Sequence, residues 1–187
     1  MKPLKAFSFA LAGCAGMAML QPMSAKADEI GHIKAIDYNG ETLVRIKALD
    51  NGNQYPVKVL INKDCATKHG TTCLHDVKAL INGEIVSVKA ISKEPNGRVS
   101  VKAITKSGRK LDVKGINENG EILDVKTVTT VGSLTHGIKA FNKQSDAMNV
   151  KGFDKSGGFY HIKTIRTEGP KSINGVQYWG DVKAISY

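Results

Sequence analysis

From residue 30 onward, apolar and polar positions alternate in short runs, and each run is centred on a lysine. The residue before each of these central lysines is Ile or Val, the residue after it is small or β-branched, and a large apolar residue follows. The central lysines are Lys34, Lys47, Lys58, Lys78, Lys89, Lys102, Lys114, Lys126, Lys139, Lys151, Lys163 and Lys183. Alternation with a period of two is typical of β-strands, so twelve units of about 12 residues predict twelve short strands.

Turn signals separate many of these runs. These signals include Asn39–Gly40, Asn51–Gly52, Asn82–Gly83 and Asn119–Gly120, in which the Gly follows the central lysine by five or six residues. Both residues of an Asn-Gly pair tolerate positive φ, which makes the pair the strongest short-range signal for a β-hairpin. Repeated Val, Ile, Thr and Gly also disfavour helix. The predicted fold class is therefore all-β, with a single domain of about twelve short antiparallel strands.

The two faces of a predicted strand differ in chemistry. In Leu111–Gly115, the Leu, Val and Gly share one face, while Asp and Lys share the other. Ile116 then lies on the lysine face, unless a bulge returns it to the apolar face, and the sequence leaves both open. The small residue after each lysine indicates a crowded inner face. We expect a closed, barrel-like arrangement, with a β-trefoil or a β-solenoid as alternatives.

The first 27 residues have the pattern of an export signal. Two lysines precede an apolar stretch, and a small-x-small cleavage site ends at Ala27. Cleavage there leaves a single β-repeat domain over 28–187, with insertions at 62–75 and 166–180 that interrupt the period. Leu11–Cys14 also resembles a bacterial lipobox, so lipidation at Cys14 is the alternative. The sequence thus predicts a periplasmic or extracellular protein, or an outer-membrane-anchored lipoprotein, and no later segment is apolar enough to span a bilayer.

The cysteines and the charge refine this picture. Cys65 and Cys73 form an even pair, and in an oxidising compartment a disulfide is favoured over a zinc site with His69 and His75. Removal of the signal takes away three lysines and no acid, so the formal charge falls from +10 to +7. That charge could favour anionic partners, but a solvated, self-repelling surface is the simpler explanation. Nucleic acid is not an expected partner of an exported protein.

Three units carry a family resemblance: Asp76–Leu80, Asp112–Ile116 and Asp181–Ile185. Through them, the chain resembles secreted repeat proteins of Bacteroidota-type bacteria built from Asp-Val-Lys-Ala-Ile units. The resemblance covers nearly all of residues 32–187, and it implies an exported address and a repeat architecture but no activity. Thr127, Gly152 and Thr164 depart from the pattern by replacing Ala.

Two groups of residues are candidate binding sites. The row of central lysines, with Lys89, Lys102, Lys114 and Lys126 at its middle, is a candidate anion-binding surface. Asp76, Asp112, Asp124 and Asp181 each lie two residues before a central lysine, where they are expected to pair with lysines of neighbouring strands. Tyr178 and Trp179 are candidates for stacking on a glycan, but burial of Trp179 as a plug at one end of the core is favoured.

The chain has no phosphate-binding Gly loop, no His-Glu-x-x-His sequence and no nucleophile elbow. We therefore expect a non-catalytic exported module, without cofactor or metal, that binds an anionic polysaccharide, another envelope component or a partner protein. A purely structural envelope protein, and a secreted hydrolase whose two carboxylates meet only in the fold, are the alternatives.

Overall fold

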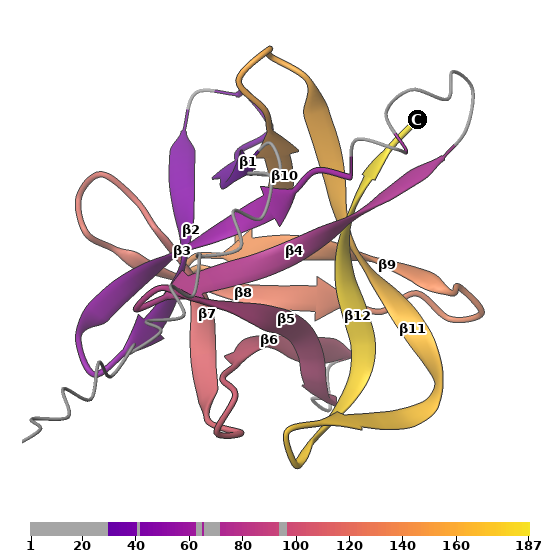
Figure 1. Cartoon of the computed structure of the whole chain (residues 1–187). Helices are drawn as coiled ribbons and strands as arrows, with labels where there is room; N and C mark the ends of the chain where they lie inside the picture. Colours follow the sequence, from indigo (N-terminus) through magenta and orange to yellow (C-terminus); the bar gives the residue numbers. More distant parts are fainter. Residues whose placement is uncertain (1–29, 41, 63–64, 66–71, 94–96) are drawn as a thin grey trace, which may run out of the picture.

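The structure is a computed structural model that describes residues 30–40, 42–62, 65, 72–93 and 97–187 (Figure 1). The predicted signal at 1–27, with Cys14, and most of the 62–75 insertion lie outside these residues. The strands are β1 (Ile30–Ile36), β2 (Leu43–Asp50), β3 (Asn53–Leu60), β4 (Cys73–Ile81), β5 (Glu84–Lys93), β6 (Arg98–Ile104), β7 (Lys110–Ile116), β8 (Ile122–Val128), β9 (Thr135–Phe141), β10 (Ala147–Phe153), β11 (Phe159–Ile173) and β12 (Val176–Ser186). All their pairings are antiparallel, so the all-β prediction with twelve strands is confirmed.

Each repeat unit forms one strand, with its central lysine inside it. Tight turns join several of the strands at the predicted Asn-Gly pairs. At Asn51–Gly52, φ is 48° and 85°, and at Asn82–Gly83 it is 48° and 82°. Two successive residues with positive φ match the right-handed twist of the flanking strands, which is why these pairs close the hairpins.

Every described strand pairs with three others. β7 shows the rule: residues 112–116 pair with β2 along one edge. Along its other edge, residues 110–112 pair with β6 and residues 114–116 pair with β8. Each strand thus has one pairing that sets its central lysine opposite another central lysine, which we call its long pairing. Its other two pairings divide the opposite edge, and we call them short pairings.

The short pairings gather the strands into four groups of three, which we call triads. The triads are β1–β2–β3, β4–β5–β12, β6–β7–β8 and β9–β10–β11. The long pairings are β1–β10, β2–β7, β3–β4, β5–β6, β8–β9 and β11–β12. Each triad is therefore joined once to each of the other three, as the corners of a tetrahedron are joined by its edges. This connectivity closes the sheet on itself, and the strands run in several directions around one centre (Figure 1).

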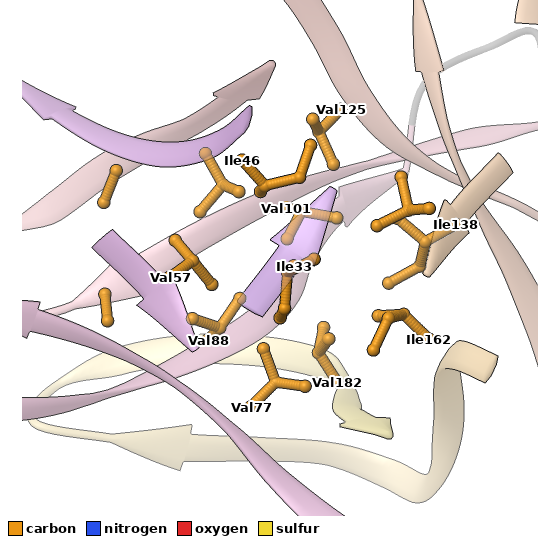
Figure 2. Close-up of a cluster of buried hydrophobic side chains, with 14 of the residues drawn as sticks. Ile33, Ile46, Val57, Val77, Val88, Val101, Val125, Ile138, Ile162 and Val182 are labelled. Atoms are coloured by element: carbon orange, nitrogen blue, oxygen red, sulfur yellow. The ribbon is translucent and has the colours of Figure 1, made fainter. Parts of the chain in front are cut away.

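The inner face supplies the core. The residue before each central lysine, at position −1, is Ile or Val and is almost completely buried. Figure 2 shows these side chains, Ile33 and Val182 among them, directed from separate strands into one shared interior. Residues at position +1 are fully buried and are small or β-branched, with Ala35, Ala48 and Ala184 each 0% exposed. The core is thus one cluster to which every strand contributes.

The crowding predicted for position +1 is present. A Cβ added at Gly115 would lie 2.7 Å from Cγ1 of Val44, closer than real Cβ contacts come. Where Thr replaces Ala at this position, the two hydroxyls satisfy each other, because Thr127 Oγ1 and Thr164 Oγ1 lie 2.6 Å apart in a buried hydrogen bond. Buried polar atoms without such a partner would destabilise the core.

The outer face carries the central lysines and the large apolar residues that follow them. Ile116 is half-buried on the lysine face while Gly115 is buried, so the alternation continues without a bulge there. Two further sequence predictions concern the disulfide and the second insertion. Cys65 and Cys73 form the expected disulfide, with 5.6 Å between their Cα atoms. The 166–180 insertion lengthens β11 and β12 into a hairpin that projects from the body at the bottom of Figure 1.

Candidate functional site: lysine triads on the outer face

All twelve central lysines are half-buried on the outer face. Each long pairing sets two of them directly opposite each other: Lys34 and Lys151, Lys47 and Lys114, Lys58 and Lys78, Lys89 and Lys102, Lys126 and Lys139, Lys163 and Lys183. Like charges directly opposite in a sheet repel. The register of this fold therefore concentrates positive charge, and neighbouring groups must offset it.

Inside a triad, each lysine faces the residue at position −2, two before the central lysine of a neighbouring strand. In β6–β7–β8, Lys102 and Lys114 form ion pairs with Asp112 and Asp124. The third lysine, Lys126, donates to Ser100 Oγ at 3.2 Å. The predicted pairing of these aspartates with lysines of neighbouring strands is confirmed.

The triad β4–β5–β12 repeats this arrangement. Lys89 and Lys183 form ion pairs with Asp181 and Asp76. Lys78 donates to Ser87 Oγ at 3.2 Å, and its ammonium also lies 3.4 Å from Asp76 Oδ2. We call β6–β7–β8 and β4–β5–β12 the acid-containing triads, because each places two carboxylates among three ammonium groups.

Two of these aspartates, Asp76 and Asp124, are held in their charged form. A hydrogen bond from Lys114 is the main reason that the pKa of Asp124 lies below its usual value. For Asp76, burial alone would raise the pKa, but the hydrogen bond from Lys183 and the charges of Lys78 and Lys183 lower it overall. The carboxylates thus act as fixed counterions for the lysines.

The other two triads have no acid at position −2. In β1–β2–β3 these positions hold His32, Arg45 and Pro56. In β9–β10–β11 they hold Gly137, Asn149 and His161. We call these the acid-free triads. Each keeps the three central lysines while lacking the carboxylates that offset them elsewhere.

A small pocket lies at the centre of each acid-free triad. In β1–β2–β3, Lys34, Lys47 and Lys58 line a pocket of about 90 Å³ together with Arg45. In β9–β10–β11, Lys139, Lys151 and Lys163 line a second pocket of about 90 Å³. Neither lining includes an Asp or Glu among the residues that the structure describes. Each pocket has room for a few water molecules or one small anion.

One histidine takes the place of an aspartate in each acid-free triad. His32 Nδ1 lies 2.7 Å from Lys58 Nζ, and His161 Nδ1 lies 2.8 Å from Lys151 Nζ. In both contacts the ammonium is the donor when the imidazole is neutral. The charge of Lys58, more than burial, lowers the pKa of His32. For His161, burial lowers the pKa most, and the charges of Lys151 and Lys163 add to it.

Two of the lysines themselves are perturbed. Burial, and then the charge of Lys47, lower the pKa of Lys58. Burial, and then the charges of Lys163 and Lys139, lower the pKa of Lys151. Both groups thus hold their protons less tightly than a free lysine. A negative charge in the pocket would reverse that effect.

The two acid-free triads are neighbours in the fold. They are joined by the long pairing of β1 with β10, in which Lys34 lies opposite Lys151. Their basic groups form one continuous surface, which we call the acid-free face: His32, Lys34, Arg45, Lys47, Lys58, Lys139, Lys151, His161 and Lys163.

The four lysines that the sequence analysis selects as candidate anion ligands do not lie on the acid-free face. Lys102, Lys114 and Lys126 share one triad, and Lys89 lies opposite Lys102 across the β5–β6 pairing. The fold does bring them together, but three of the four have an aspartate partner. Anion binding by these four stays a prediction. The acid-free face was missed. Its six units all lack Asp at position −2, but so do two units of the acid-containing triads, where Ser87 and Ser100 stand, so the missing Asp alone does not mark the face.

Tyr178 and Trp179 both line an open pocket of about 350 Å³ on the extended β11–β12 hairpin, with Arg166 beside them. Trp179 is half-buried, and its ring lies 5.0 Å from that of the buried His136. The Lys89 ammonium lies 4.5 Å from the centre of the Tyr178 ring. The Arg166 guanidinium also lies over the Trp179 ring, 5.8 Å from its centre, and stacking on a glycan stays a prediction.

Among the residues that the structure describes, no three His, Cys, Asp or Glu side chains are grouped as metal ligands. His75 is buried, and its two nitrogens contact the Asn62 amide at 3.1 Å and the Ser186 hydroxyl at 3.0 Å. The described residues also contain no helix with the length and apolar character needed to cross a bilayer.

Comparison with known protein families gives one match. Residues 27–185 match the model of a family of unknown function (DUF7486). Comparison with curated proteins and with solved structures found no match.

Proposed function

We propose that this chain, which belongs to the family of unknown function DUF7486, is a non-catalytic exported module that binds an anionic polymer of the cell envelope. The acid-free face is the proposed binding surface. The observation that carries the proposal is the uneven distribution of acids over equivalent triads. Two triads offset most of their lysine charge with their own aspartates, and the two adjacent triads leave the same charges to an outside partner.

Stability alone would favour the opposite distribution. An Asp at position −2 relieves repulsion between lysines, as it does in the acid-containing triads. Leaving two neighbouring triads without it costs folding free energy, which binding of an anion would offset. Charge on a folded surface also steers a charged partner toward it, more strongly at low ionic strength.

Export and lack of catalysis are further parts of the proposal. The Cys65–Cys73 disulfide is compatible with an oxidising compartment. Near-identical units placed on equivalent positions of the fold favour repeated binding contacts, since catalysis usually needs one unlike place.

The test is binding of the purified protein to sulfated, phosphorylated, carboxylated and neutral polysaccharides, measured by calorimetry at low and high salt. We expect the anionic polymers to bind and their affinity to fall with added salt, because screening weakens contacts between exposed charges. The triple variant Lys34→Gln, Lys47→Gln and Lys58→Gln should bind much more weakly.

The matched control is Lys102→Gln, Lys114→Gln and Lys126→Gln, which removes the same three charges from an acid-containing triad. If both triple variants lose affinity equally, general surface charge is responsible and the acid-free face is not the site. If no anionic polymer binds at low salt, a purely structural envelope role replaces this proposal. Cleavage of a polymer during the measurement would indicate a hydrolase.

A further inference from the structure

We infer that each acid-free triad is a site for one tetrahedral oxyanion, the phosphate or sulfate group of the bound polymer, held by three lysines from three strands. The inference rests on the proposed function, and it names the chemical group that the acid-free face recognises. The two sites are the pocket of Lys34, Lys47 and Lys58 and the pocket of Lys139, Lys151 and Lys163.

The number and arrangement of the lysines around each pocket match those of the terminal oxygens of the proposed ligand. The three short pairings of a triad bring three lysines around one pocket, each from a different strand. A phosphate monoester or a sulfate ester presents three terminal oxygens, so each ammonium can donate to its own oxygen. A carboxylate presents two oxygens in one plane, which suits a bidentate Arg better than three separate lysines.

The acid-containing triads are an internal comparison. They have the same three lysines at equivalent positions, but the carboxylates of Asp112 and Asp124 already accept hydrogen bonds from Lys102 and Lys114. Two protein carboxylates thus occupy the place that an oxyanion would take. In the acid-free triads, the side-chain ammonium groups of Lys34, Lys47 and Lys163 have no hydrogen bond or ion pair within the described part of the chain.

The two sites lie next to each other, because Lys34 of one is opposite Lys151 of the other. One chain with repeated phosphate or sulfate esters can therefore occupy both. The second contact is then intramolecular, so a polymer binds far more tightly than a single ion without any new contact.

Each pocket contains one histidine, whose pKa can report the binding of an anion. His32 faces Lys34, Lys47, Lys58 and Lys155. His161 faces Lys151 and Lys163, and its ring packs against Phe159 and Tyr187. An oxyanion in the pocket stabilises the protonated imidazole, so the pKa of the histidine should rise when the anion binds.

The experiment is a titration of the histidine rings by NMR, with inorganic phosphate or sulfate compared with chloride and acetate at equal ionic strength. We expect the pKa of both His32 and His161 to rise with phosphate and with sulfate, and to change little with acetate or chloride. The buried His75 and His136 serve as controls, and their pKa values should not move. Equal responses to all four anions would overturn the inference, as would no response to any.

A conservative substitution then tests one pocket at a time. Asn149 is at position −2 facing Lys139, with Oδ1 2.5 Å from Nζ, so Asn149→Asp adds a carboxylate without changing the shape. We expect this variant to weaken phosphate binding at His161 by roughly fivefold, the effect of one charge at contact distance in water. The response of His32, in the other pocket, should be unchanged.

The outcomes separate the inference from the proposed function. If anionic polymers bind but phosphate and sulfate do not shift His32 and His161, the face binds polymers without oxyanion sites and the inference fails alone. If phosphate binds with the same strength in wild type and in Asn149→Asp, the second pocket is not the site. Failure of every polymer to bind removes the proposed function as well.

Discussion

Asn149→Asp should also make the protein more stable when no anion is present. The substitution converts a neutral hydrogen-bond acceptor, 2.5 Å from the Lys139 ammonium, into a carboxylate. Asn149 is exposed, so the new ion pair is screened by solvent. Exposed pairs contribute about 0.2–1 kcal/mol, and we expect a gain of about 0.5 kcal/mol. For a domain of this size that is a rise of about 1–2 °C in Tm.

The reverse change is available at an equivalent position. Asp124 faces Lys114 in an acid-containing triad, and its side chain is 54% exposed. Asp124→Asn removes that charge while keeping the shape, and we expect it to lower the unfolding free energy by about 0.5 kcal/mol. The pair of variants thus changes one charge in opposite directions at matched sites.

The assay is urea unfolding in a buffer of low ionic strength without phosphate or sulfate, repeated at high salt. The two variants should shift the midpoint in opposite directions, and both shifts should shrink at high salt, where the Debye length is about 3 Å at 1 M. Added phosphate binds only the native state and should therefore stabilise the protein. Because Asn149→Asp weakens that binding, the stabilisation should be larger for wild type than for the variant. If Asn149→Asp is neutral or destabilising at low salt, the acid-free triads are not under charge strain and the reasoning is refuted.

Three further predictions concern the core and its pH dependence. Gly115→Ala should destabilise the fold by about 1–3 kcal/mol through overpacking, while Gly137→Ala, which has open space at its Cβ, should not; thermal unfolding compares the two. Burial lowers the pKa of His75, so this histidine takes up a proton more readily in the unfolded chain than in the folded one. The free energy of unfolding should therefore fall as the pH drops below about 6.5. His75→Gln should make that dependence on pH weaker, as measured by denaturant titrations at several pH values. Thr127→Val leaves the buried Thr164 hydroxyl without its partner and should lower the free energy of unfolding by about 1–3 kcal/mol. Adding Thr164→Val removes that hydroxyl and should restore most of the loss. Additive losses in the double-mutant cycle would contradict this.

Much of this fold can be predicted from local patterns. The alternation around each central lysine predicts the strands, and Asn51–Gly52 and Asn82–Gly83 predict hairpins with positive φ. The pairing of Asp112 and Asp124 with lysines follows from their place on the lysine face. These features depend on neighbours in sequence, or on the rule that alternate residues share a face.

The form of closure cannot be predicted in the same way. Twelve similar strands can pair in many orders, and nothing in one unit specifies its distant partner. β12 completes a triad with β4 and β5, so Lys183 meets Asp76 at a separation of 107 residues. The units of the acid-free face come from both halves of the chain, 30–60 and 135–166. Their missing acids are visible in the sequence, but only the triads show that those positions surround shared pockets.

The most direct test of the central claim is a crystal structure of the protein soaked in selenate, a tetrahedral oxyanion that can be located by its anomalous scattering. The account predicts one selenate in the pocket of Lys34, Lys47 and Lys58 and one in the pocket of Lys139, Lys151 and Lys163, with none in the acid-containing triads. Selenate spread evenly over all four triads, or absent from both acid-free pockets, would contradict it.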